Sequence, residues 1–255
     1  MKRIVTILLI LLCVAAGAAR WLDVVNYTDL TTGFVTHGSY VWRYVVAGSI
    51  TAVLILVSLT APKQPHALDG QNKPQGVLVT ICGILFAALG GLGIYQCQLQ
   101  DRFGLLVHIL YLFTGLWMLL LGKTRFTEVF EAPSRSAILG VVGTLSFYLL
   151  VIERFGLSPT GIVRVGTTLQ GLAALSVLLF CTAQLKSAYV PGGKRGAWVW
   201  FTGMAAFLFA TCLALPGVIC TYWVGQSDFL QLLEAIALAV VGATGATYAV
   251  TVMES

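Results

Sequence analysis

Two side chains deep in the apolar part of this chain could do chemistry, the imidazole of His108 and the carboxylate of Glu234. Each lies five residues into a long apolar stretch, which corresponds to about 8 Å of helix. Ionisable groups inside a membrane are costly and usually face a partner or a water-filled cavity. We therefore predict that the two side chains face each other, and a role in a proton pathway or in ligand binding is one interpretation of the pair. The alternative is that Glu234 reaches water or head groups and His108 bonds a backbone carbonyl.

Three uncharged polar side chains, Gln170, Ser49 and Thr51, are expected at a similar depth. Together with His108 and Glu234 they would line a polar vestibule in the outer half of a helical bundle. Such a layer is the kind of site that a small solute or ligand could enter.

The elements that must position these groups are membrane helices. The chain is 58% hydrophobic and only 10% charged, whereas a soluble domain is about 25% charged. Crossing a bilayer takes roughly 20 apolar residues. We predict an all-α polytopic helical membrane bundle, a single transmembrane domain over residues 1–255. After a first helix that begins at Ile4, the apolar stretches are 44–61, 76–98, 103–122, 136–152, 165–185, 197–220 and 229–252.

The first of these eight helices also fits a secretory signal, because Lys2 and Arg3 precede an apolar run that ends in small residues. Leu22, Val24 and Val25 can extend the run to a full span while Arg20 reaches the interface. We favour the uncleaved helix, and cleavage would leave seven helices.

Basic residues indicate the orientation, since Lys and Arg in short loops stay on the cytoplasmic side. Ten of the fifteen Lys and Arg fall on the side that holds both chain ends, and five fall on the other side. The sequence thus predicts a multi-pass protein of the cell membrane with cytoplasmic N- and C-termini.

Rows of small residues predict where helices approach closely. Gly83, Ala87 and Gly91 form one row in the 76–98 stretch, and Ala239 and Gly242 belong to another in the last stretch. Small residues let helix backbones come near enough for dispersion contacts in lipid. The lipid bilayer is therefore one expected partner, and a membrane protein or a second copy of the chain is another.

Two hairpins look like copies of each other. The segment 84–87 (Ile-Leu-Phe-Ala) precedes His108 as 207–210 (Phe-Leu-Phe-Ala) precedes Glu234. Halves of four helices, 1–122 and 123–255, would then have the same orientation about an axis along the membrane normal. Chance similarity between apolar helices remains the alternative.

A turn of the form Asp-x-x-Thr-Gly-Phe, from Asp29 to Phe34, follows the first helix. In this feature and in its general helix layout the chain resembles uncharacterised multi-pass membrane proteins of Gram-positive bacteria. The resemblance covers these six residues and implies no activity.

Cysteines offer one further expectation. Cys97 and Cys220 fall at the outer ends of two helices, where an oxidising exterior would permit a disulfide if their Cα atoms lie within about 7 Å. The other interpretation is two separate thiols.

Several function classes lack support in the sequence. The fifteen Lys and Arg form no basic stripe for nucleic acid, and no metal-ligand spacing, cofactor motif or catalytic motif occurs. We expect a non-enzymatic scaffold, accessory subunit or sensor. The alternative is a small-solute or proton-coupled transporter with its vestibule around His108 and Glu234.

Overall fold

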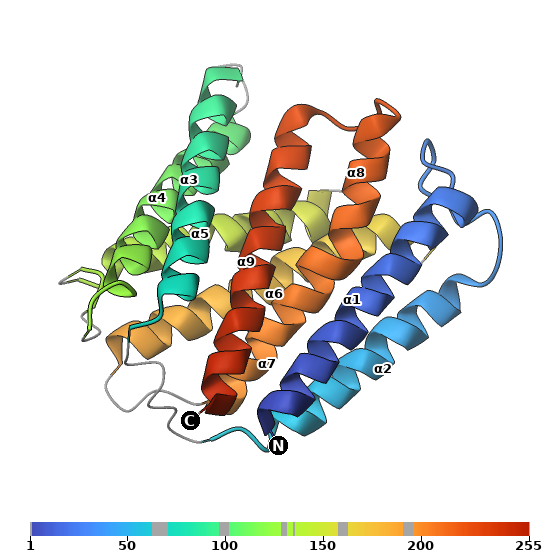
Figure 1. Ribbon diagram of the computed structural model, residues 1–255. Helices are drawn as coiled ribbons and strands as arrows, with labels where there is room; N and C mark the ends of the chain where they lie inside the picture. Colours follow the sequence, from blue (N-terminus) through green and yellow to red (C-terminus); the bar gives the residue numbers. More distant parts are fainter. Residues whose placement is uncertain are drawn as a thin grey trace.

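Eight helices long and apolar enough to cross a membrane make up this computed structural model, in which residues 2–62, 71–96, 102–128, 132–134, 136–157, 163–190 and 196–254 are described (Figure 1). The expected all-α polytopic bundle is confirmed. Every backbone amide in a bilayer must be satisfied within the protein, and continuous helices do this without a second segment.

The eight spans follow the expected order with small shifts at their ends. Two of them contain a wider π-helical segment, η2 in the fifth span and η3 in the seventh. The elements are α1 (Lys2–Tyr27), α2 (Tyr40–Ser58), α3 (Lys73–Gln96), α4 (Arg102–Thr124), α5 (Ile138–Ile152), η2 (Glu153–Leu157), α6 (Val165–Tyr189), α7 (Gly196–Ala206), η3 (Phe207–Ala214), α8 (Leu215–Trp223) and α9 (Phe229–Glu254).

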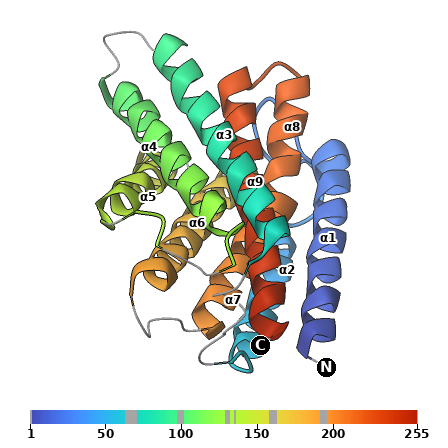
Figure 2. The same ribbon diagram turned by 60° about the vertical axis from the view of Figure 1, so that its left-hand side comes forward.

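The last two spans form the centre of the bundle and are the most buried. Helix α9 packs against α7, η3, α3 and α1, while α3 and α4 form a closely packed hairpin to one side (Figure 2). Helix α2 is the least buried span, and its close backbone contact is with α7. Helix α1 packs instead against η3, α9 and α8.

Glycines mark the closest helix contacts, as the rows of small residues predicted. A Cβ at Gly83 of α3 would lie 2.9 Å from the carbonyl oxygen of Gly115 on α4. A Cβ at Gly242 of α9 would lie 2.6 Å from the carbonyl oxygen of Ala206 on α7, and Ala239 is buried one turn earlier. Gly91 was expected in the first row, but a Cβ there would meet nothing within 4 Å. The α3 row instead follows Gly83 to Gly90, because 3.6 residues per turn carries Gly91 off the contact face.

Both chain ends lie at the same end of the bundle (Figures 1 and 2). Arg3 of α1 and Glu254 of α9 form an ion pair with 3.1 Å between Nη1 and Oε1. Farther along α1, Leu9 and Cys13 are buried in the core. Helix α1 therefore contributes to the core, and the choice between a cleaved and an uncleaved first helix stays a prediction. We call the opposite end of the bundle the far end.

Pro216 explains why the seventh span is not a regular helix. Proline has no amide hydrogen for the helix ladder, and its ring clashes with the carbonyl four residues earlier. The turns of η3 widen directly before it, and α8 restarts at Leu215 with the proline in its first turn. Thr211 in η3 donates a hydrogen bond to the carbonyl of Ala239 at 2.7 Å, which ties the widened segment to α9.

Candidate functional site

Glu234, the predicted chemical group of the last helix, lies near the start of α9 and is bound by two other elements. Its Oε1 accepts a hydrogen bond from Arg154 Nη2 in η2 at 2.6 Å, and its Oε2 accepts one from the Tyr111 hydroxyl in α4 at 3.0 Å. Arg154 Nη1 also donates to Gln170 Oε1 in α6 at 3.3 Å. We call Tyr111, Arg154, Gln170 and Glu234 the Glu234 cluster. It brings together Gln170 and Glu234, two of the five predicted polar residues.

His108 reaches the Glu234 cluster through Tyr111, with 6.1 Å between the two ring centroids. Its ring packs directly on Gly93 of α3. The predicted approach of His108 to Glu234 stays a prediction, and the structure pairs that carboxylate with Arg154. The reason is local geometry, since η2 continues α5 beyond Ile152 and returns Arg154 to the bundle. A guanidinium is always charged and suits a carboxylate partner.

A small cavity of about 50 Å³ adjoins the Glu234 cluster. One water needs roughly 10 to 15 Å³ of such space, so the cavity has room for a few waters. Hydroxyl and amide groups contribute to its wall beside the ion pair. The lining residues are Arg154, Gln170, Ala173, Ala210, Ala214, Leu215, Val218, Thr221, Ser227, Gln231, Glu234, Ala235 and Leu238.

The predicted polar residues of α2 do not line that cavity. Ser49 Oγ donates to the carbonyl of Val45 at 2.7 Å, and Thr51 Oγ1 donates to that of Ala47 at 2.8 Å. Hydroxyls in helices commonly bond the carbonyl four residues earlier in this way. The expected single vestibule therefore does not include Ser49 and Thr51, because α2 packs on α7 at the edge of the bundle.

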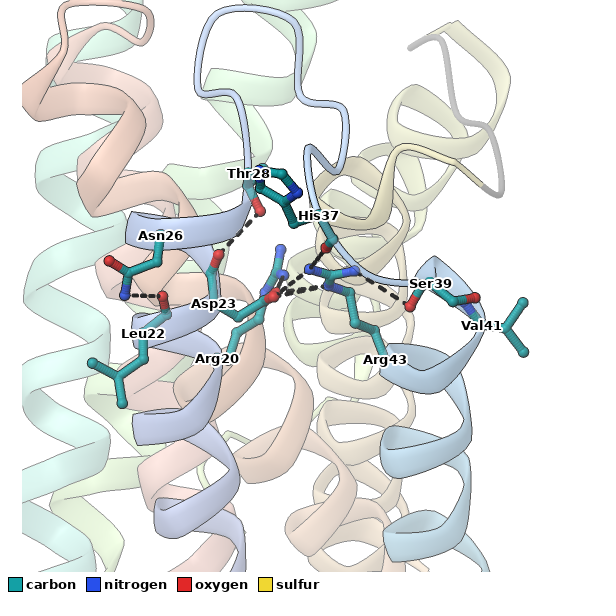
Figure 3. Close-up of polar contacts among 9 residues, drawn as sticks. All are labelled: Arg20, Leu22, Asp23, Asn26, Thr28, His37, Ser39, Val41 and Arg43. Carbon is teal, nitrogen blue, oxygen red and sulfur yellow. Dashed lines mark hydrogen bonds and ion pairs between the residues drawn. The ribbon is translucent and has the colours of Figure 1, made fainter.

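A second polar cluster, which the sequence analysis missed, joins α1 to α2 at the far end (Figure 3). The Asp23 carboxylate accepts hydrogen bonds from Arg43 Nε at 3.0 and 2.9 Å and also binds Arg43 Nη2 and Arg20 Nη1. Arg43 further donates to the carbonyls of Ser39 and His37, each at 3.3 Å. We call Arg20, Asp23 and Arg43 the Asp23 triad. It holds two positive charges and one negative charge.

The Asp23 triad is largely removed from solvent. Side-chain exposure is 6% for Arg20, 14% for Arg43 and 19% for Asp23. The Nε atom of Arg20 is buried without a hydrogen-bond partner among the described residues. The sequence predicts that Arg20 extends toward the membrane interface. It turns inward instead, because Asp23 lies one helical turn away on the same face of α1.

The loop between α1 and α2 returns the chain so that Arg43 meets Asp23. Thr28 and Val35 pair across it, and the tight turn predicted at Asp29 is present. The backbone of Gly33 has a φ of +73°, which residues with a side chain rarely adopt. Asp29 accepts hydrogen bonds from Thr31 and Thr32, and these lower the pKa of its exposed carboxyl to about 2.

A cavity of about 430 Å³ opens beside the Asp23 triad. Its polar end holds the triad and the start of α2, and the remaining wall is apolar and comes from α1, α2, α6 and η3. The lining residues are Ala16, Ala19, Arg20, Asp23, Tyr27, His37, Gly38, Ser39, Trp42, Arg43, Val46, Ala47, Ile50, Val165, Leu169 and Leu213. We call this space the far-end cavity.

One signal in the sequence pointed to the Asp23 triad. Arg20 and Asp23 are spaced i and i+3, which places opposite charges side by side on a helix. The contribution of Arg43 depends on the path of the loop, which the spacing of residues does not specify. Asp23 and His37 both line the far-end cavity.

The disulfide considered between Cys97 and Cys220 stays a prediction. Cys97 lies outside the described residues, and Cys220 is a buried thiol at the end of the seventh span.

No protein-family model, curated protein or solved structure matches this chain.

Proposed function

We propose that this membrane protein has no catalytic activity and binds a small membrane-resident molecule in the far-end cavity, in the manner of a sensor or accessory subunit. The observation that carries the proposal is the cavity itself, about 430 Å³ with polar groups gathered at one end. Ligand pockets typically measure 300 to 1,000 Å³ and combine apolar walls with a few placed polar groups.

Access from the membrane supports this proposal. Helix α2 forms one wall of the cavity and is the least buried span. It is attached to α1 through the Asp23 triad and to α7 through backbone packing. A molecule dissolved in lipid could therefore enter between α1 and α2 without crossing the packed centre of the bundle.

The lining groups favour binding over catalysis. The carboxylate of Asp23 already accepts hydrogen bonds from two guanidiniums, which makes it a poor general base. The lining hydroxyl of Ser39 accepts a hydrogen bond from the Val41 amide at the start of α2, which suits a helix cap.

Filling the cavity tests the proposal. Ala47 is buried and lines the cavity, so Ala47→Phe should occupy the space of a bound molecule. The matched control is Ala52→Phe, which adds the same side chain to the exposed face of α2. Native mass spectrometry of the full chain would use three oleoyl probes, namely lysophosphatidic acid, lysophosphatidylcholine and monooleoylglycerol. We expect one bound copy of at least one probe in the wild type and the control, and none in Ala47→Phe. Failure of all three to bind the wild type would overturn the proposal.

A second candidate function is proton-coupled transport of a small solute, which the Glu234 cluster favours. There a titratable carboxylate lines a cavity with room for a few waters. Solute-dependent proton flux into liposomes that disappears in Glu234→Gln and persists in the control Arg3→Gln would support transport. A wild-type protein that moves no protons with any tested solute would leave the binding proposal ahead.

A further inference from the structure

We infer that the far-end cavity takes a single-chain amphiphile with an anionic head group, its head at Arg20 and Arg43 and its chain along the apolar wall. This inference rests on the proposed binding function and names the chemical class of the ligand.

Charge is the first argument. The Asp23 triad contains two guanidiniums and one carboxylate, and in the described part of the chain neither guanidinium pairs with any other acid. A net positive charge therefore remains at a site with little solvent. Burying an uncompensated charge is expensive, so an anion bound at the site would be strongly favoured.

An unused hydrogen-bond donor is the second argument. Arg20 is 7% exposed, lines the cavity, and uses Nη1 to bind Asp23. Its buried Nε–H has no acceptor among the described residues. A carboxylate or phosphate oxygen in the cavity would supply that acceptor, and hydrogen bonds between charged groups are the strong ones.

The rim of the cavity adds positive potential. Val165, the first residue of α6, lines the cavity, and the preceding Arg164 makes no side-chain cap to that helix. The first amides of a helix carry a partial positive charge and favour anions. The Arg164 guanidinium lies over the ring of Phe34, 5.1 Å from its centroid, and so adds a further cation on this side of the molecule.

The apolar wall favours a lipid over a free anion as the ligand of the far-end cavity. Below the triad the cavity is lined by side chains such as Val46, Ile50, Leu169 and Leu213, which offer nothing to a hydrated phosphate. They would instead make dispersion contacts with the hydrocarbon chain of an amphiphile that enters from the membrane. The polar end and the apolar wall therefore match the two parts of one molecule.

The test compares probes that differ in the head group. Binding to the full chain in a neutral detergent is measured with oleoyl lysophosphatidic acid, oleoyl lysophosphatidylcholine, monooleoylglycerol and inorganic phosphate. We expect the anionic lipid to bind at least about tenfold more tightly than the other two lipids. The neutral lipid has no charged oxygen to accept from Arg20, and the zwitterionic lipid brings an ammonium group to a site that already has a net positive charge. Inorganic phosphate should neither bind nor displace it.

Variants at Arg20 test whether the preference for the anionic lipid comes from the Asp23 triad. Arg20→Gln should weaken binding of the anionic lipid about tenfold and leave binding of the neutral lipid unchanged. Arg20→Lys keeps the charge and the pairing with Asp23 but lacks Nε, so it should still lose severalfold and covers the case in which Arg20→Gln fails to fold. Arg3→Gln removes one positive charge from the opposite end of the bundle, where Arg3 is exposed, and should bind like the wild type.

The outcomes separate the two proposals. Equal affinity for all three lipids, or equal loss of all three in Arg20→Gln, would overturn the anionic head group and leave the cavity as a lipid site. Competition by inorganic phosphate would show a free-anion site and overturn the amphiphile. Absence of any lipid binding would overturn the proposed function as well.

Discussion

The Arg43 guanidinium on α2 binds both carboxylate oxygens of Asp23 on α1, with Nε 3.0 and 2.9 Å from the two oxygens. This ion pair fastens α2 to α1 at the far end, where the two helices otherwise flank a cavity. The ion pair therefore holds the two helices together beside the cavity.

Removing Asp23 should destabilise the protein strongly. Asp23→Ala leaves the guanidiniums of Arg20 and Arg43 buried side by side without an acid, and loss of one partner of a buried pair costs about 3 to 5 kcal/mol. Thermal unfolding in detergent measures the change. Asp29→Ala in the neighbouring exposed turn is the control and should change stability far less. Similar unfolding temperatures for the two variants would contradict the structural role of the triad.

Glu234 and Tyr111 should be energetically coupled. Tyr111→Phe removes the hydrogen bond to Glu234 and should cost about 1.5 to 3 kcal/mol, because the acceptor is charged. In Glu234→Gln the same hydroxyl faces a neutral amide. We therefore expect the double variant to be less destabilised than the sum of the two single changes. Additive effects in this double-mutant cycle would show that the two side chains act independently.

Gly83 and Gly91 should respond differently to the same substitution. In Gly83→Ala the added Cβ would lie 2.9 Å from the carbonyl oxygen of Gly115 and 2.7 Å from Leu119 Cγ, so α3 and α4 must separate. Overpacking of this kind costs about 1 to 3 kcal/mol. Gly91→Ala meets open space and should be neutral or stabilise α3 by up to about 1 kcal/mol. Urea or thermal unfolding of both variants checks the contrast, and equal destabilisation would refute it.

The turn at Asp29 should hold its shape until the solution is strongly acidic. Hydrogen bonds from Thr31 and Thr32 lower the pKa of this carboxyl from 3.8 to about 2. Because the folded pKa is lowered, the stabilisation is present above pH 4 and is lost as the pH falls from about 4 to 2. Carboxyl carbon NMR of the labelled residue follows the titration, with Thr32→Val as a variant that should return the pKa toward 3.8. A wild-type midpoint near 4 would show that these hydrogen bonds do not form.

Much of the fold could be predicted because it depends on length and apolar composition alone. Each of the eight apolar stretches forms a span, because a helix satisfies the backbone hydrogen bonds of a segment inside the bilayer. The sequence also predicted close helix contacts at Gly83 and Gly242, where a side chain would collide with a neighbouring backbone. The division into two halves stays a prediction.

The candidate sites could be predicted only in part, because charge pairing depends on how chain segments return to one another. Glu234 was recognised by its position inside an apolar stretch, yet its partner Arg154 was placed in a loop. The π-helical turn of η2 that moves Arg154 inward has no simple sequence signal. Arg20 was likewise expected at the interface, and Arg43 was counted only among the five basic residues on the outer side. The loop between α1 and α2 instead brings both to one carboxylate.

The ion pair between Arg3 and Glu254 has a practical consequence for protein engineering. Since the first and last helices begin and end beside each other, a short peptide could join them into a closed ring. The ring could then be cut in the exposed turn near Thr31, and this circular permutant would retain every helix. Affinity tags, by contrast, would sit side by side at that one corner, so a bulky group on either terminus would crowd the other.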